Sequence, residues 1–270
     1  MPCSFESLLP VAKRLRLSSM IRYAMELERD VKTAQMSHAE FLAKLFDGEC
    51  ERRDEDALRR RLQQANFRYV DASLARIDWS EDRQINRSLV NTLASNDYIK
   101  YRQNVIVTGA TGCGKTWLAD ALGHTACLAG FKVKHYRVAQ MLKEYERLST
   151  ENTSAGRRQY LSGLGKIDVL ILDDWGIGQL DDNKRFSLYE IIENHSQHGS
   201  FIVTSVLPVK QWKEYLNDPL MSDSILDRLA YNSHRLELKG KSMRSRPEYG
   251  GLSKAEKEEK IISHQPALSE

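Results

Sequence analysis

Cysteine is scarce in this chain of 270 residues, and no apolar run approaches the length of a membrane span. The four cysteines, at positions 3, 50, 113 and 127, form no Cys-x-x-Cys pair, which argues against a disulfide framework or a zinc site. Residues 1–17 lack the apolar core of a signal peptide. We therefore expect a cytoplasmic protein with no membrane partner.

A dominant sign of charge is also missing. Forty Lys and Arg residues oppose 37 Asp and Glu residues, and the resulting net charge of +3 does not by itself demonstrate nucleic-acid binding. His195 and His198 are three residues apart, but no acidic or cysteine ligands in a metal-site pattern accompany them. We expect both histidines to be solvated at the end of a helix.

A complete phosphate-binding loop, G-x-x-x-x-G-K-[ST], occupies residues 109–116. An apolar, β-branched run at 104–108 precedes it, and residues 117–128 have helical apolar spacing. Backbone N–H groups at such a strand–helix junction hold phosphate oxygens. Lys115 would neutralise the β- and γ-phosphates, and Thr116 would offer its hydroxyl to Mg²⁺. The predicted ATP-binding residues of the loop are Gly109, Ala110, Thr111, Gly112, Cys113, Gly114, Lys115 and Thr116.

A second motif supplies carboxylates. The apolar run at 169–172 ends in Asp173 and Asp174, which should emerge at the carboxyl edge of the sheet beside the loop. One carboxylate there can hold Mg²⁺ through water, and the other can orient or deprotonate the attacking water. The expected cofactors are ATP and Mg²⁺.

The composition changes twice along the chain. Residues 1–76 are rich in Ala, Leu, Arg, Glu and Met, which predicts a helical N-terminal domain for partner or DNA interaction. Its segment 49–61 is densely charged, and we favour a solvated surface of ion pairs over a rim that faces DNA or a partner. Residues 77–245 would form the ATPase domain, and the polar residues 246–270 a mobile tail.

Alternating elements predict the fold class of the second domain. Helices separate the apolar runs, notably at 138–148 and 184–197. Such alternation is typical of an α/β domain, a parallel sheet covered by helices on both faces. The expected strands are 104–108, 132–136, 168–173, 200–205 and 234–238.

The chain resembles a known family in four segments that follow the loop. These are residues 170–176, 203–208, 225–229 and 238–244. Together with the helical N-terminus they are similar to the IstB-type helper ATPases of bacterial insertion sequences, members of the AAA+ class related to the DnaC helicase loader. The resemblance covers roughly residues 8–246. It implies a homo-oligomer that binds DNA largely without sequence preference and engages a transposase.

The resemblance also implies roles for single residues. Asp173 would direct the magnesium ion and Asp174 would activate water. Arg228 matches the arginine finger, which reaches the nucleotide of a neighbouring subunit; the alternative is a surface ion pair with Asp223 or Asp227. A further implied contact is the sensor-two arginine, which reaches the same nucleotide from the C-terminal segment. The residue at that position is Arg244.

One position departs from the family pattern. Relatives carry Asn or Gln where this chain has Val206, which cannot hydrogen-bond a phosphate or a catalytic water. Either Thr204 or Ser205 takes the sensor-one role, or phosphate sensing is weakened.

Basic residues between the second and third core strands are the candidates for DNA contact. Residues 154–158 place two guanidinium groups after an expected flexible loop, which suits backbone phosphates. A solvated basic face is the alternative for each residue. The candidates are Lys143, Arg147, Arg157, Arg158 and Lys166.

Three other functions remain open at this point. A replicative helicase loader shares the core and differs in its N-terminal region. A monomeric kinase is disfavoured by the paired acids and by residues 225–229. A binding module with a structural ATP site stays possible because of Val206.

Overall fold

The structure is a computed structural model that describes residues 4–29, 33, 35–80, 83–150 and 154–243. It divides the chain into two compact units, Met1–Arg60 and Arg61–Glu270. The boundary falls inside a long helix and lies earlier than the boundary expected at residue 76. The intervening residues belong to the second unit.

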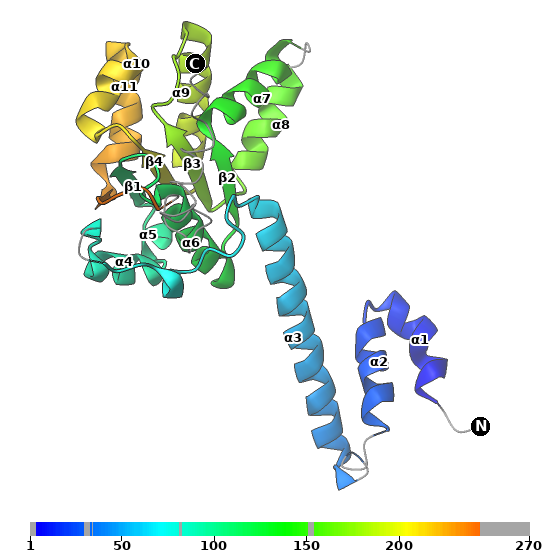
Figure 1. The fold of residues 1–270 in the computed structure, drawn as a ribbon. Coiled ribbons are helices and arrows are strands. Elements are labelled where there is room, and N and C mark those ends of the chain that lie inside the picture. Colours follow the sequence, from blue (N-terminus) through cyan, green and yellow to red (C-terminus); the bar gives the residue numbers. More distant parts are fainter. Residues whose placement is uncertain (1–3, 30–32, 34, 81–82, 151–153, 244–270) are drawn as a thin grey trace, which may run out of the picture. The chain divides into compact units, whose positions relative to one another are not determined.

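The first unit is helical (Figure 1). It consists of α1 (Phe5–Arg14), α2 (Ser18–Leu27) and the part of α3 (His38–Ala65) that precedes residue 61. Side chains from α2 and α3 form a small apolar core that contains Met20, Ala24, Leu27 and Leu45. None of the described helices is long and apolar enough to cross a membrane.

The second unit is built on a parallel sheet of five strands in the order β2-β3-β4-β1-β5 (Figure 1). All five expected strands occur, with ends shifted by no more than two residues. The strands are β1 (Asn104–Gly109), β2 (Val133–Arg137), β3 (Val169–Trp175), β4 (Ser200–Ser205) and β5 (Ser233–Leu238).

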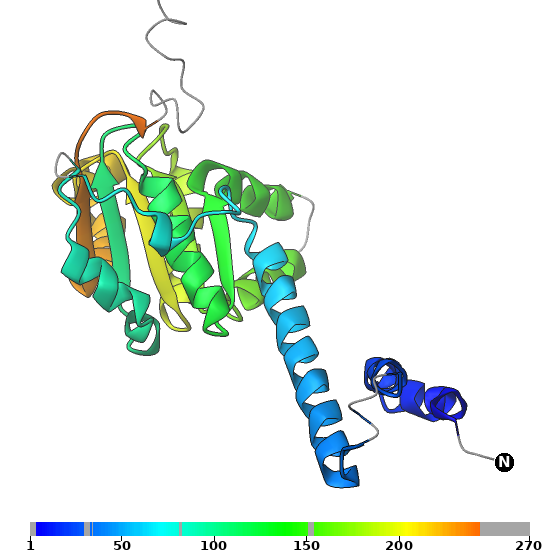
Figure 2. The ribbon, with the colours of Figure 1, turned by 60° about the horizontal axis from the view of Figure 1, so that its bottom comes forward.

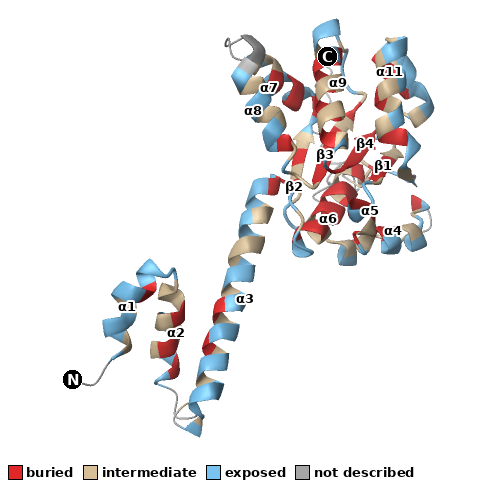
Figure 3. Ribbon diagram, turned by 180° about the vertical axis from the view of Figure 1, so that it is seen from behind, coloured by how far each residue is buried: buried red, intermediate tan, exposed pale blue. Residues whose placement is uncertain are grey.

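Helices cover both faces of this sheet, which confirms the predicted α/β class (Figure 2). One face packs on α6 (Lys115–Leu128), and the other forms a large core in which Ile106, Leu172 and Val203 meet the remaining long helices. The central strands are buried along their length (Figure 3). The helices on the second face are α7 (Val138–Thr150), α8 (Ser154–Leu164), α9 (Asp182–Ser196), α10 (Trp212–Leu216) and α11 (Pro219–Leu226).

Short elements complete the second unit. A single turn of π-helix, η5, leads into β5 after α11. The others lie before β1 or between β4 and α10. These elements are η2 (Leu74–Arg76), α4 (Arg87–Ala94), α5 (Asp97–Lys100), η4 (Val209–Gln211) and η5 (Asp227–Tyr231).

The expectation of two solvated histidines is wrong for His195. Its side chain is completely buried at the end of α9, 4.8 Å from the ring of Phe201, while His198 is exposed. Its ring nitrogens lie 3.2 Å from the carbonyl oxygens of Leu164 and Ser200. Burial lowers the pKa of His195 to about 4, so it is a neutral core residue.

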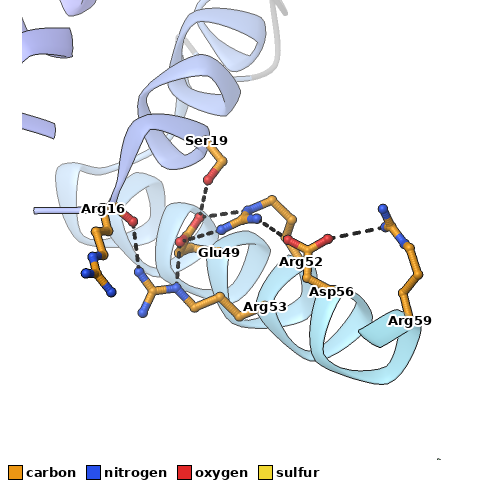
Figure 4. A network of polar contacts seen from close by, with 7 residues as sticks. All are labelled: Arg16, Ser19, Glu49, Arg52, Arg53, Asp56 and Arg59. Atoms are coloured by element: carbon orange, nitrogen blue, oxygen red, sulfur yellow. Dashed lines mark hydrogen bonds and ion pairs between the residues drawn. The ribbon is translucent and has the colours of Figure 1, made fainter. Parts of the chain in front are cut away.

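The charged segment of α3 contains the ion pairs expected from its sequence, but one member is buried (Figure 4). Glu49 accepts hydrogen bonds from Arg52, Arg53 and the hydroxyl of Ser19. The bond from Arg52 is the main reason that the pKa of Glu49 falls to about 2, although burial opposes it. The network joins α2 to α3 within the first unit.

Candidate functional site

The strand order gathers the expected site residues at one edge of the sheet. Because β4 lies between β1 and β3, the carboxyl ends of all three strands are adjacent. The phosphate-binding loop follows β1, the paired acids end β3, and Thr204 ends β4. Such an edge is where ligands bind in open parallel sheets.

Two glycines of the loop have a left-handed backbone conformation that a residue with a side chain would adopt only with strain. Gly112 and Gly114 have φ of +83° and +92°, and a Cβ on Gly112 would lie 2.2 Å from the Ser242 hydroxyl. Lys115 is buried, and its Nζ donates to the carbonyl oxygens of Gly109 and Ala110, at 2.9 Å each. The Cys113 side chain is buried, so only its backbone is suited to contact phosphate.

Asp173 is the centre of the site. Its Oδ1 accepts hydrogen bonds from the hydroxyls of Thr116, at 2.8 Å, and Thr204, at 2.5 Å. Its Oδ2 is buried without a hydrogen bond, 3.7 Å from His135 Nε2. Mg²⁺ prefers oxygen ligands and binds through few protein groups. The Thr116 hydroxyl and the Asp173 carboxylate therefore fit the magnesium site expected from the sequence.

The charge state of Asp173 follows from its neighbours. Burial disfavours its ionised form, but the nearby His135 ring and the hydrogen bonds from Thr204 and Thr116 outweigh burial and lower the pKa of Asp173 to about 2. Burial also opposes protonation of His135, yet Asp120 and Asp173 raise the pKa of its ring to about 9. The site therefore holds an ionised carboxylate at neutral pH.

Asp174, the expected water-activating acid, has an unusual backbone. Its φ is +62°, in the left-handed region that costs roughly 1–2 kcal/mol for a residue with a side chain. Two contacts maintain it: Asp174 N donates to Thr204 Oγ1, and Asp174 Oδ2 accepts from Arg137 Nε at 3.1 Å and pairs with Arg137 Nη2 at 3.0 Å. Strain of this kind is common at functional sites.

The two candidates for the sensor-one role lie differently. The Thr204 hydroxyl donates a hydrogen bond to Asp173 Oδ1 and accepts one from Asp174 N. Ser205 donates to the Trp175 carbonyl oxygen at 3.0 Å and accepts from Leu207 N, so its hydroxyl is used within the fold. Val206 lines the pocket beside the loop. Of the two hydroxyls, only that of Thr204 contacts the Asp173 carboxylate.

A pocket of about 300 Å³ lies over the loop. The segment that precedes β1 supplies one wall of the pocket, including Tyr69, Arg76 and Asp78. Arg83 braces the loop from this segment, because its Nη2 donates to the Cys113 carbonyl oxygen at 2.7 Å. Sequence reasoning missed Arg83, Arg137 and His135, which lie in unremarkable segments and reach the site only through the fold.

The expected arginine finger is not at this pocket. Arg228 lies on η5, and Asn104 Nδ2 at the start of β1 donates to its carbonyl oxygen at 2.6 Å. The loop follows the other end of β1, roughly 17 Å away along the strand. The Arg228 guanidinium pairs with Glu193 and donates to Ser224, not to the acids considered from the sequence. Arg244 lies outside the described residues.

The DNA candidates are distributed over two helices. Lys143 and Arg147 are exposed on α7, and Arg158 is exposed on α8. The expectation of a flexible loop within 154–158 is wrong, because these residues form the start of α8. Arg157 turns inward, where it pairs with Glu190 and stacks over the ring of Tyr145.

Lys166 is separate from the other DNA candidates. It is exposed in the turn before β3, at the end of the sheet opposite to the loop.

Comparison with known proteins identifies relatives over most of the chain. The sequence pattern of the family described as "IstB-like ATP binding protein" matches residues 10–249. A Sinorhizobium fredii protein named for ATP binding in an insertion sequence is 36% identical over 238 residues, covering 87% of this chain and 94% of its own length. The similarly named protein of insertion sequence IS1162 from Pseudomonas fluorescens is 40% identical, covering 72% of this chain and 83% of its own.

Solved structures share the fold. The DnaC helicase loader aligns with a TM-score of 0.51 and 18% identity, covering 63% of this chain and 97% of its own. The AMPPCP-bound DnaA of Aquifex aeolicus aligns with a TM-score of 0.53 and 15% identity, covering 76% and 59%. At these identities the likeness concerns architecture, and it confirms the AAA+ fold expected for the second unit.

Proposed function

Because this chain belongs to the family of IstB-like ATP-binding proteins, we propose that it is a DNA-binding helper ATPase of insertion-sequence transposition. In this proposal ATP assembles the protein on DNA as a homo-oligomer, and the assembly engages a transposase. The observation that carries it is the Thr116–Asp173–Thr204 cluster with Asp174 beside it, because these groups suit hydrolysis of a magnesium-bound nucleotide.

Each residue of the cluster has a part in hydrolysis. The loop N–H groups and Lys115 bind the β- and γ-phosphates, while Thr116 and Asp173 hold Mg²⁺. When bound, the ion supplies charge neutralisation on the phosphates. Asp174 accepts a proton from the attacking water as the water oxygen bonds to the γ-phosphorus and the bond from that phosphorus to the ADP oxygen breaks.

The position of Arg228 supports action between subunits. It lies at the sheet edge opposite to its own loop, so its guanidinium is better placed for a nucleotide on a neighbouring copy. In the single chain that guanidinium is occupied by Glu193 and Ser224. Assembly would exchange these contacts for a γ-phosphate. Hydrolysis would then depend on the oligomer.

Charge supports a collective mode of DNA binding. A net charge of +3 gives a single chain only a weak overall attraction to DNA, but adjacent copies would align Lys143, Arg147 and Arg158 along one duplex. Contacts to phosphates carry little sequence information, so the preference for sequence would be weak. The transposase as partner is inferred from relatives that are named for insertion sequences.

Two variants test the proposed ATPase. Lys115→Ala should lose ATP binding and ATP-dependent assembly, because the phosphates lose their main cation. Asp174→Asn should bind ATP and assemble but turn over at least about 100-fold more slowly, the order expected for loss of a general base. Nucleotide affinity, assembly state and phosphate release are measured separately for each. Normal turnover in Asp174→Asn would contradict the role of that carboxylate.

A further inference from the structure

A line of three ionisable side chains runs through the interior behind the magnesium-directing carboxylate. Asp120 on α6, His135 on β2 and Asp173 on β3 are 0%, 4% and 0% exposed, respectively. They come from three elements that are distant in sequence and are brought together on the sheet face that α6 covers. Neither Asp120 nor His135 belongs to the phosphate-binding loop or to the paired acids.

Asp120 fixes the orientation of the imidazole. Its Oδ1 lies 2.6 Å from His135 Nδ1, and its Oδ2 accepts the backbone N–H of Tyr69 at 2.9 Å. Both oxygens of Asp120 are therefore used, and the His135 ring has one nitrogen left. That nitrogen, Nε2, is directed at Asp173 Oδ2 from 3.7 Å.

Asp173 has an asymmetric environment. Its Oδ1 accepts two hydroxyl hydrogen bonds, from Thr116 and Thr204, whereas its buried Oδ2 accepts none from the described residues. Two nitrogen atoms approach Oδ2: His135 Nε2, and Nη1 of Arg68 at 3.8 Å. Arg68 has an exposed, long side chain, while the His135 ring is held by Asp120. His135 is thus the pre-organised partner of this oxygen.

We propose that His135, oriented by Asp120, is a positioning residue for Asp173 and thereby sets the affinity of the site for magnesium-bound ATP. This inference rests on the proposed function. Groups that serve metal sites are themselves held by outer hydrogen bonds, and loss of such a partner typically costs about 10–100-fold in metal affinity. The bond from Tyr69 N also ties Asp120 to the wall of the nucleotide pocket, because Tyr69 lines that pocket.

Two substitutions distinguish the roles of the two ring nitrogens of His135. His135→Asn keeps an amide nitrogen near the place of Nδ1, so it retains the bond to Asp120 and withdraws from Asp173. His135→Gln carries its amide nitrogen farther out, near the place of Nε2, so it retains a donor for Asp173. A third variant, Asp120→Asn, keeps an acceptor for Tyr69 N and loosens the imidazole.

The readout is binding, not turnover. The full-length protein and each variant are titrated with a fluorescent ATP analogue over a series of Mg²⁺ concentrations, with EDTA as the metal-free arm. We expect His135→Asn and Asp120→Asn to raise the half-saturating Mg²⁺ concentration about 10–100-fold, with unchanged metal-free affinity. His135→Gln should stay close to the wild type, because it keeps a donor near the place of Nε2. Thermal unfolding checks the fold of each variant.

Three outcomes would overturn the inference. A wild-type Mg²⁺ dependence in His135→Asn would exclude a role of the ring in positioning Asp173. An equal loss of metal-free affinity in the Asn and Gln variants would show that the ring is only part of the core. If His135→Asn did not fold, an unchanged Mg²⁺ dependence in Asp120→Asn would also exclude the positioning role of His135. A wild-type protein that binds the nucleotide without any effect of Mg²⁺ would instead refute the proposed function.

Discussion

At the scale of residues, the geometry of the site depends on which carboxylate oxygen of Asp173 or Asp174 each donor group contacts. The sequence identifies the loop and the paired acids because each is a contiguous motif. It leaves Thr204 and Ser205 equivalent, since their hydroxyl directions depend on how β4 lies between its neighbours. His135 and Arg137 could not be found by a motif, because only the pairing of β2 with β3 places them beside the acids.

Arg137 yields a prediction about basal activity. Its Nε donates a hydrogen bond to Asp174 Oδ2 and its Nη2 forms an ion pair with the same oxygen, which could otherwise accept a proton from water. Arg137→Ala should therefore raise ATP hydrolysis in the absence of DNA, by roughly 2–13-fold if the pair contributes about 0.5–1.5 kcal/mol.

Phosphate release at saturating ATP measures this effect. Arg137→Lys is the matched control, since it retains a cation at the end of β2 and should change the rate less. A slower rate in Arg137→Ala would mean that the arginine holds Asp174 in its productive position.

At the scale of elements, buried parallel strands are the best predicted part of the molecule. They are continuous apolar runs because both faces of the sheet are covered, so their positions are evident from the sequence. The short helices α10 and α11 and the π-turn η5 have no sustained apolar period, so their bounds do not follow from the sequence. The start of α8 favours a loop in the sequence because Ser154 and Gly156 disfavour a helix locally, while the packing of α8 against α7 and α9 favours one.

The Glu49 network gives a prediction about the first unit. Replacing Glu49 by Gln should destabilise that unit by about 1–3 kcal/mol, the range for a buried partner of charged hydrogen bonds. Because the pKa of Glu49 is lowered from 4.5 to about 2, its contribution is complete above pH 4.5 and is lost as the pH falls towards 2. The difference between wild type and variant should shrink over the same range.

Amide hydrogen exchange in α1 and α2 of the full-length protein measures this difference, after correction for intrinsic rates. Glu51→Gln, at an exposed position of the same helix, is the control and should leave protection unchanged. Equal protection in wild type and Glu49→Gln at neutral pH would show that the network does not hold α2 to α3.

At the scale of the whole molecule, the proposed function requires one copy of the protein to complete the nucleotide site of another. Arg228→Ala and Lys115→Ala proteins should each lack ATPase activity, for different reasons. When they are mixed, some interfaces should combine an intact loop with an intact arginine, and part of the activity should return. Phosphate release across mixing ratios measures this recovery, and no recovery in proven mixed oligomers would place Arg228 outside the reaction.

The central claim is that ATP couples to DNA through assembly. Fluorescence anisotropy of a labelled duplex, with ATP, with ADP and without nucleotide, tests it most directly over a series of protein and salt concentrations. We predict steep, ATP-dependent binding that weakens with salt, and a smaller salt dependence in Arg158→Ala with unchanged ATP affinity. Binding that is independent of nucleotide and of protein association would contradict the account.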